Sequence, residues 1–318
     1  MAEAQSRLNR VQPALGHSSR LAMIGGAGLA LAYAALWFFT RYDFALMRDL
    51  WFLPGVGVVG AIIANASGTG GGVVFVPVFN ALRDLGNMTL GPLQVVAVSM
   101  GIQSFGMSLG ALRWTDRLYH QHEPNPLEAS TRARDYWLVC PLVLALSTPA
   151  LLWTQRMVDF DPRMVLLGYK TFSILLGIAL IVATWTVNLA VAERDRLARV
   201  DLAMLALIAI PGGAITALFS VGIGELVAFY LFLRHYPMVL CVGTACVISA
   251  VSCIAGLLWH VEAGTVAWEV VLLAAPGAML GAFLARPIAL WLGARRLKTL
   301  GGLWIVASAL YLVWLAAR

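Results

Sequence analysis

Long apolar stretches, separated by short polar segments, run along almost the whole chain. Seven of these stretches can be marked in the sequence. Each is close to, or longer than, the roughly 20 residues that a helix needs to cross a hydrocarbon core of about 30 Å. They lie at residues 21–40, 91–112, 136–154, 164–189, 237–259, 266–287 and 299–316. The pattern predicts an all-α polytopic membrane protein.

The first apolar stretch could also be a cleaved signal. It follows Arg7, Arg10 and Arg20, and it contains the triplet Ala-Tyr-Ala at 32–34, which imitates a signal-peptidase site. The apolar run continues beyond that triplet, whereas the apolar region of a secretory signal is usually only about 7–15 residues long. We therefore expect a retained membrane span.

Two glycine-containing stretches interrupt the apolar pattern and resemble each other. Residues 64–72 read ANASGTGGG, and residues 217–225, 153 positions later, read ALFSVGIGE. An ungapped alignment of 60–79 with 213–232 has eight identities in twenty positions. Chance apolar similarity would produce roughly two, so the alignment indicates an internal repeat.

The repeat divides the chain into four parts. Residues 1–51 form a cytoplasmic tail and an extra N-terminal helix, 52–189 form repeat 1, 190–201 form a polar linker, and 202–318 form repeat 2. A continuous helix over 52–82 would measure about 46 Å, too long for one comfortable crossing.

A re-entrant helical hairpin fits this length better, with its Gly-rich tip near mid-depth. The predicted arms are 52–66 with 73–82 in repeat 1, and 202–218 with 226–232 in repeat 2. Each repeat then holds one broken hairpin and three transmembrane helices, and the second repeat is inverted relative to the first. Inverted repeats with discontinuous helices are typical of secondary transporters. A single crossing of each broken segment remains the alternative.

Charge placement favours the hairpin topology. Arg and Lys concentrate in the N-terminal tail and in 113–135, 190–201 and 293–298, which the hairpins place on one side. The positive-inside rule makes that side cytoplasmic, including the N-terminus. A single crossing would put two of these loops outside. We attribute the net charge of +6 to topology and to attraction by membrane lipid, and we expect no nucleic-acid partner.

Composition supports a membrane protein and excludes several other classes. Of the 318 residues, 60% are apolar and only 12% are charged, which leaves little water-facing surface. The four cysteines fall inside predicted spans and form no CxxC motif, so neither a disulfide scaffold nor a zinc site is expected. The Gly-rich tip lacks the Lys-Ser/Thr of a P-loop, and no nucleophile lies beside a base in the spans. We expect no enzyme activity, no metal and no cofactor.

The residues at the two breaks resemble the TauE/SafE family of membrane anion permeases, often labelled sulfite exporters. The resemblance covers about 52–316 and rests on these segments: 68–72 with 76–78 in the first half, and 213–214, 220–225, 237 and 243–244 in the second. It implies a bacterial multi-pass protein of the cytoplasmic membrane that transports sulfite, a sulfonate or sulfoacetate. Glu225 stands where a third glycine would be, and Tyr230 replaces the proline at Pro77, so the hairpins are not equivalent.

The chemistry of the breaks suits an anion. Glycines at the start of the second arm would expose backbone N–H groups and the positive end of a helix dipole, and nearby hydroxyls could add hydrogen bonds. This arrangement avoids a buried permanent cation. The candidate substrate-binding residues are Asn65, Ser67, Thr69, Gly70, Gly71, Gly72, Gln103, Ser220, Gly222, Gly224 and Thr244. The alternative is that these small residues only permit close helix packing.

Two ionisable residues have candidate roles. Glu225 lies at the second tip within an apolar segment and is the candidate proton-coupling residue, with a structural acid as the alternative. Lys170 could attract anions toward the cavity, or it could snorkel to the membrane interface.

These observations predict a secondary active transporter for a small organosulfur anion, coupled to protons, with its site between the two breaks at the bilayer midplane. A passive anion channel with paired hairpins is the alternative. The expected partners are the sulfur anion, protons and membrane lipid. The oligomeric state stays open, a homodimer included.

Overall fold

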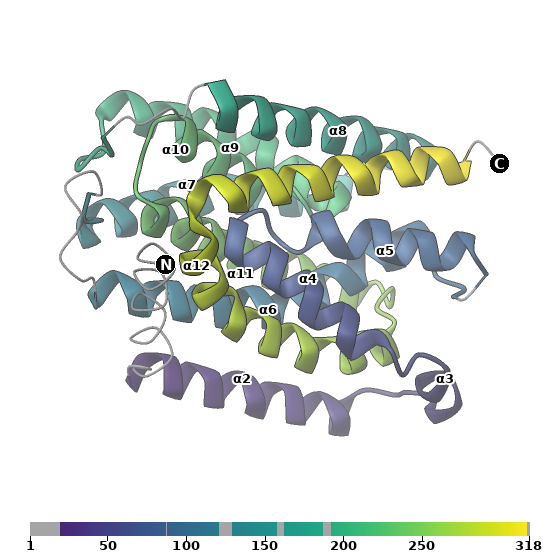
Figure 1. Ribbon diagram of the computed structural model, residues 1–318. Helices are drawn as coiled ribbons and strands as arrows, with labels where there is room; N and C mark the ends of the chain where they lie inside the picture. The colour runs from purple at the N-terminus through teal and green to yellow at the C-terminus, as the bar shows by residue number, and fades with distance from the viewer. Residues whose placement is uncertain (1–19, 87, 121–128, 158–161, 187–191, 317–318) are drawn as a thin grey trace, which may run out of the picture.

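A computed structural model describes residues 20–86, 88–120, 129–157, 162–186 and 192–316 (Figure 1). Every regular element in these ranges is a helix, so the predicted all-α class is confirmed. The elements are α2 (Arg20–Phe39), α3 (Phe44–Asp49), α4 (Leu53–Ser67), α5 (Gly72–Asp84), α6 (Pro92–Tyr119), α7 (Ala133–Met157), α8 (Pro162–Thr186), α9 (Arg199–Phe219), α10 (Ile223–Leu233), α11 (Met238–Glu262) and α12 (Trp268–Ala316).

Among the residues that the structure describes, six helical segments are long and apolar enough to cross a membrane. They are Ala22–Phe39, Pro92–Tyr119, Ala133–Met157, Arg199–Phe219, Met238–Glu262 and Trp268–Leu292. One of them, Arg199–Phe219, was expected to be only the first arm of a hairpin, yet it has 21 residues and full spanning length.

The last helix also differs from expectation. The sequence predicted two spans, 266–287 and 299–316, with a loop between them. The chain is instead helical throughout Trp268–Ala316, and in Figure 1 its lime and yellow parts run in opposite directions around a sharp turn. Pro287 lies inside this helix, where a missing backbone donor allows bending. The polar segment 293–298, which was predicted to be a loop, is part of this helix.

The two halves of the chain exchange their packing partners. Helix α4 packs mainly against α12 and helix α9 against α7, while α6 and α11 pack together between them. Glycines make these contacts close: a Cβ on Gly277 of α12 would overlap the carbonyl oxygen of Pro54, and one on Gly213 of α9 would overlap that of Ser147. Small residues let membrane helices approach backbone to backbone, so these glycines hold each broken helix against the opposite half.

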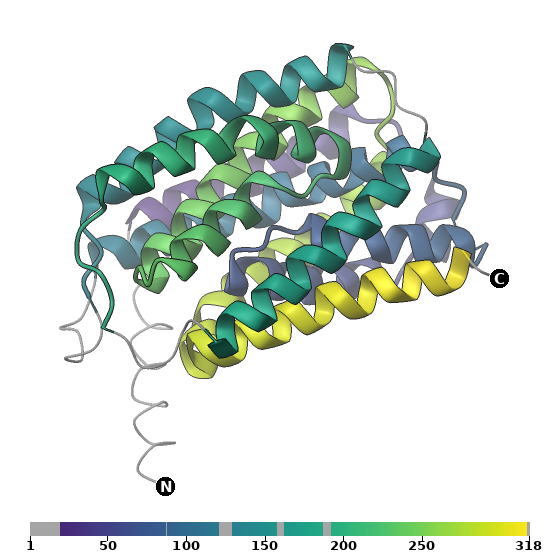
Figure 2. The same cartoon turned by 90° about the horizontal axis from the view of Figure 1, so that it is seen from above.

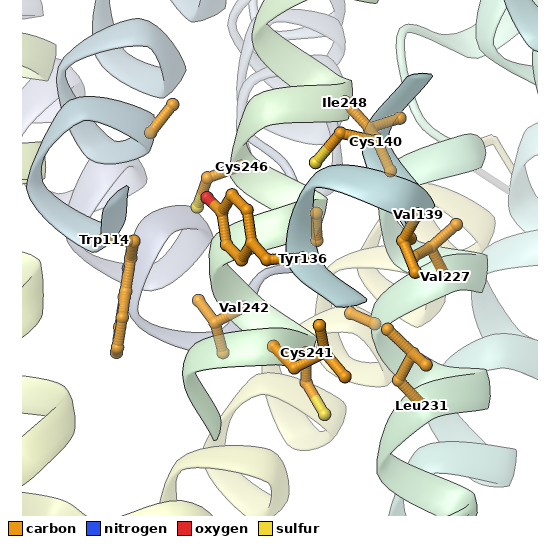
Figure 3. Close-up of a cluster of buried hydrophobic side chains, with 14 of the residues drawn as sticks. Trp114, Tyr136, Val139, Cys140, Val227, Leu231, Cys241, Val242, Cys246 and Ile248 are labelled. Carbon is orange, nitrogen blue, oxygen red and sulfur yellow. The ribbon is translucent and has the colours of Figure 1, made fainter. Parts of the chain in front are cut away.

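One of the large apolar clusters in the described part of the chain packs against α10. Figure 3 shows Val227 and Leu231 of α10 facing Val139 of α7, with Cys241 and Ile248 of α11 closing the cluster. All of these side chains are buried. Desolvated packing of this kind keeps the short helix α10 in place although it has only 11 residues.

Both broken segments reverse the direction of the chain. In Figure 1, α5 runs back from the first break toward the end at which α4 begins, and in Figure 2, α10 returns from the second break along α9 toward the opposite end. Such reversals are what re-entrant hairpins require. Re-entrance into a membrane and the inverted repeat stay predictions.

A buried carboxylate ties the two ends of the second hairpin together. Asp201, in the first turn of α9, accepts hydrogen bonds from Tyr230 Oη at 2.6 Å and Arg234 Nε at 2.7 Å, and also from Tyr236 Oη. Burial and the hydrogen bond to Asp201 raise the pKa of Tyr236, which keeps its phenol protonated as a donor. The start of α9 and the end of α10 are thereby fixed side by side.

Candidate functional site

Each broken helix ends in a residue with left-handed backbone. Gly68 follows α4 with φ 74° and donates its N–H to the Ala64 carbonyl, and Ser220 follows α9 with φ 56° and donates to the Thr216 carbonyl. The first break comprises residues 68–71 and the second 220–222. The second is one residue shorter, so the ungapped alignment pairs residues of different conformation: Ser67 is still helical, whereas its aligned counterpart Ser220 is the helix cap.

The side-chain amide of Gln103, in the middle of α6, connects the two breaks. Its Oε1 accepts the backbone N–H of Gly71 at 2.6 Å. Its Nε2 donates to the Ser220 hydroxyl at 2.8 Å and to the Ser220 carbonyl at 3.2 Å, and it lies 3.1 Å from the Ser99 hydroxyl. Gln103 is buried, so these bonds form away from water and hold the breaks at a defined separation.

The breaks also touch directly. A Cβ on Gly70 would collide with Oε1 of Glu225, and a Cβ on Gly72 would collide with the carbonyl oxygen of Ser220. Gly70 has φ 62°, so glycine suits this position both for its backbone angle and for the close approach of the carboxyl group. The space beside Gly71 is occupied, since a Cβ there would lie 2.6 Å from Cγ of Gln103 and 2.7 Å from the Phe75 ring.

The carboxyl group of Glu225 lies between the two breaks. Oε2 accepts the backbone N–H of Gly222 at 2.7 Å, at the N-terminus of α10. Oε1 is buried and has no hydrogen-bond partner within the described residues. The carboxylate therefore uses one of the amide donors expected for an anion, and its other oxygen faces the glycine of the opposite break.

Several amides at the start of α5 are not used by the protein itself. Within the described ranges, no hydrogen bond involves the backbone N–H of Gly70, Gly72 or Val73. These groups lie at the positive end of the α5 dipole, where an anionic oxygen is stabilised. The arrangement can hold an anion without a buried cation.

The hydroxyl residues next to the first break contact each other. Ser67 Oγ and Thr69 Oγ1 are 2.7 Å apart, and Ser67 also donates to the Ile63 carbonyl at 2.7 Å. Gly224 packs against α11, where a Cβ would collide with Oγ of Ser249. The contact of Gly224 is thus a packing contact.

Two predicted residues, Asn65 and Thr244, lie apart from this cluster. Asn65 donates to the Ala61 carbonyl at 2.9 Å, and its Oδ1 faces Gly110 of α6 and the thiol of Cys246. Thr244 donates to the carbonyl of Leu240 in its own helix at 2.6 Å. The side chain of Lys170 lies outside the described part of the structure.

A second polar cluster was missed by sequence reasoning. Arg286 of α12 donates from Nη1 to Asp116 Oδ2 at 3.0 Å and to the Arg113 carbonyl at 2.9 Å, while the Arg113 guanidinium lies 4.2 Å above the Phe283 ring. All three polar residues are buried. Asp116 and Asp201 are thus buried carboxylates in addition to Glu225. The i, i+3 spacing of Arg113 and Asp116 on one helix face was a usable signal.

The fold and the facing breaks define a multi-pass, all-helical membrane protein with a polar centre built from discontinuous helices. Its family follows from comparison: residues 52–312 match the family model described as Sulfite exporter TauE/SafE, and the chain belongs to that family. The resemblance inferred from the glycine patterns is confirmed, and the chain is a membrane transporter of the sulfite-exporter type. No curated protein and no solved structure matches it.

Proposed function

We propose that this chain is a secondary active transporter that moves a small organosulfur anion, such as sulfite, a sulfonate or sulfoacetate, across the bacterial cytoplasmic membrane together with a proton. The N-terminus is cytoplasmic in this proposal. The observation that carries it is the contact of the two breaks through Gln103, beside the buried carboxyl group of Glu225.

The site would use donors from both breaks. The amides of Gly70 and Gly72 at the start of α5 form one half-site. The Ser67 and Thr69 hydroxyls would join it by turning away from the Ile63 carbonyl and from each other. The Ser220 hydroxyl and the Gln103 amide form the other. In the structure, the Gly71 N–H and the Ser220 hydroxyl are both hydrogen-bonded to Gln103. An anion that takes these donors would displace Gln103, and the separation of the breaks would then depend on whether the site is loaded.

Glu225 links the anion to a proton. Two unit charges about 5 Å apart repel by about 3 kcal/mol at an effective dielectric constant of about 20. An ionised Glu225 would therefore oppose the anion, and a protonated one would not. Since Gly222 already donates to this carboxyl group, a charged Glu225 also competes for the donors of the second break. The anion and the proton would bind together and travel in the same direction.

The test is flux into proteoliposomes that contain the full chain. A sulfite or sulfonate gradient is applied with and without a pH gradient, and radiolabelled anion is followed. We expect accumulation against the anion gradient when the pH gradient is present, and its loss when the gradient is collapsed. Purely downhill flux that ignores the pH gradient would instead favour the anion channel. Absence of flux for every sulfur anion would contradict the substrate class.

A further inference from the structure

A line of buried residues with small or polar side chains, here called the stripe, runs along α11. Ser249, Cys253, Gly256 and His260 follow each other at spacings of four, three and four residues, which places them on one face of a helix with 3.6 residues per turn. All four are buried, whereas Leu258 on another face is exposed. The stripe carries a hydroxyl, a thiol and an imidazole inside an apolar helix, and polar groups in such a position are by default candidates for a functional role.

The stripe begins at the candidate site. Gly224 approaches the Ser249 hydroxyl so closely that a Cβ would collide with it, and Glu225 is the next residue. Cys253 lies one helical turn further along the same face of α11 and is buried. The carboxyl group of Glu225 thus borders the first turn of the stripe.

A glutamine of α7, Gln155, contacts the middle of the stripe at Gly256. Gln155 donates from Nε2 to the Gly256 carbonyl at 3.2 Å. Its Oε1 is buried and has no hydrogen-bond partner within the described part of the chain. A glutamine with one satisfied and one unsatisfied polar atom therefore lies between Glu225 and the end of α11.

The stripe ends at a buried histidine near the α11–α12 loop. His260 has no exposed surface, and its Nδ1 lies 2.9 Å from Oγ1 of the half-buried Thr265. Its Nε2 has no partner among the described residues. Eleven residues of helix separate Ser249 from His260, a rise of roughly 16 Å. Glu269 lies at the same end of the molecule and accepts the N–H of Asp43 at 3.1 Å. This end is separated by the length of α11 from Asp201, which lies beside the start of α11.

Three buried atoms along this route lack partners within the described ranges: Glu225 Oε1, Gln155 Oε1 and His260 Nε2. Buried polar atoms in native proteins are almost always paired, and ordered water supplies the partner where protein does not. Water molecules between these three atoms would form a hydrogen-bonded chain along α11.

We propose that this stripe is the proton route between Glu225 and the membrane face at the α11–α12 loop, with His260 as the proton acceptor at its outer end. The proposal rests on the proposed proton coupling. The proton leaves Glu225 Oε1, which becomes a carboxylate, and passes through water to His260 Nε2, which becomes an imidazolium. The imidazolium then releases a proton to the solution, and uptake runs in reverse.

Within the described part of the chain, the route carries the titratable side chains of Glu225, Cys253 and His260. Glu225 is faced by Gln103 from α6, by Gly70 from the first break and by the Cys253 thiol from α11. His260 is flanked by the Trp259 ring and by Thr265. An imidazole can accept a proton at one ring nitrogen while the other nitrogen donates, so His260 is the group suited to relay protons.

The test compares His260→Gln and Gln155→Leu with His120→Gln, a matched control on the other side of the molecule, where the side chain is 56% exposed. Two rates are measured in proteoliposomes: anion–anion exchange, which needs no net proton movement, and accumulation driven by a pH gradient. We expect parental exchange and at least about tenfold slower proton-driven accumulation in both route variants. The control should keep both rates.

A rescue experiment excludes a purely structural role. Imidazole should restore proton-driven accumulation in His260→Ala, whereas pyrrole, which has the same size but is not basic, should not. Parental accumulation in His260→Gln and Gln155→Leu, or an equal loss of exchange and accumulation in both, would overturn the proposal. If the parent itself exchanges anions without responding to a pH gradient, the proton coupling fails and the route fails with it. Absence of any exchange by the parent contradicts the proposed transport instead.

Discussion

Gln103 Nε2 lies 2.8 Å from the Ser220 hydroxyl, although the two residues are 117 positions apart in sequence. The oxygen of the same side-chain amide accepts the backbone N–H of Gly71. Gln103 of α6 is therefore hydrogen-bonded to both helix breaks. A change at either break has to alter this pair of hydrogen bonds.

Replacing Gln103 by Leu tests that link. The substitution keeps a side chain of similar size but leaves the Gly71 N–H and the Ser220 hydroxyl without this partner. A buried unsatisfied polar group costs about 1–3 kcal/mol. The anion then no longer has to displace Gln103 from these donors, so we expect anion affinity to rise by about 10-fold, measured as a larger anion-induced thermal stabilisation of the purified protein. Ser104→Ala is the control, because Ser104 donates only to the Met100 carbonyl of its own helix. Equal affinity in Gln103→Leu and parent would remove Gln103 from the site.

Gly70→Ala should abolish transport. The new Cβ would collide with Oε1 of Glu225, and φ at 62° is unfavourable for alanine. Gly55→Ala in the preceding helix α4 is the matched control, because a Cβ there meets nothing within 4 Å. We expect Gly55→Ala to transport normally and to be as stable as the parent or slightly more so, since alanine favours helix by about 1 kcal/mol over glycine. Uptake rates and thermal unfolding of both variants check this, and normal uptake by Gly70→Ala would contradict the close approach.

Glu225→Gln isolates the role of the carboxyl group. In the parent, ionisation of Glu225 opposes the anion, so binding should weaken as pH rises and the carboxyl group loses its proton. Glutamine mimics the neutral form at every pH, so binding should stay strong and become independent of pH. Proton-driven accumulation should vanish while anion exchange persists. Binding titrations across a pH series measure the first effect and flux measures the second. A pH-dependent accumulation equal to that of the parent would make Glu225 a structural acid.

Asp201→Asn should loosen the second hairpin. Asp201 holds Tyr230, Arg234 and Tyr236 at once and has no exposed surface. Losing its charge weakens charge-assisted hydrogen bonds, which are worth about 1.5–3 kcal/mol each. We expect a lower unfolding temperature and faster proteolysis between α10 and α11. Asp195→Asn, at a side chain that is 69% exposed, should leave both unchanged. Equal stability of the two variants would show that Asp201 does not anchor the hairpin.

Local sequence patterns determined the elements of this protein. Apolar runs of spanning length predicted the helices, and clustered Gly, Ser and Thr residues predicted where two of them break, because both properties depend on neighbouring residues alone. The same breaks carried the family resemblance. Boundaries were less secure: α12 is helical where a loop was expected, since bending at a proline need not end a helix.

Tertiary structure alone decided which polar side chains meet. Asn65 and Gln103 looked equivalent in sequence, yet Gln103 joins the breaks and Asn65 faces Cys246. Asp116 and Arg286 pair across 170 positions, and His260 is buried with one nitrogen unsatisfied within the described residues. A sequence shows the face of a helix on which a residue lies, but the helix that covers that face depends on long-range packing, here on the exchange of partners between the two halves of the chain.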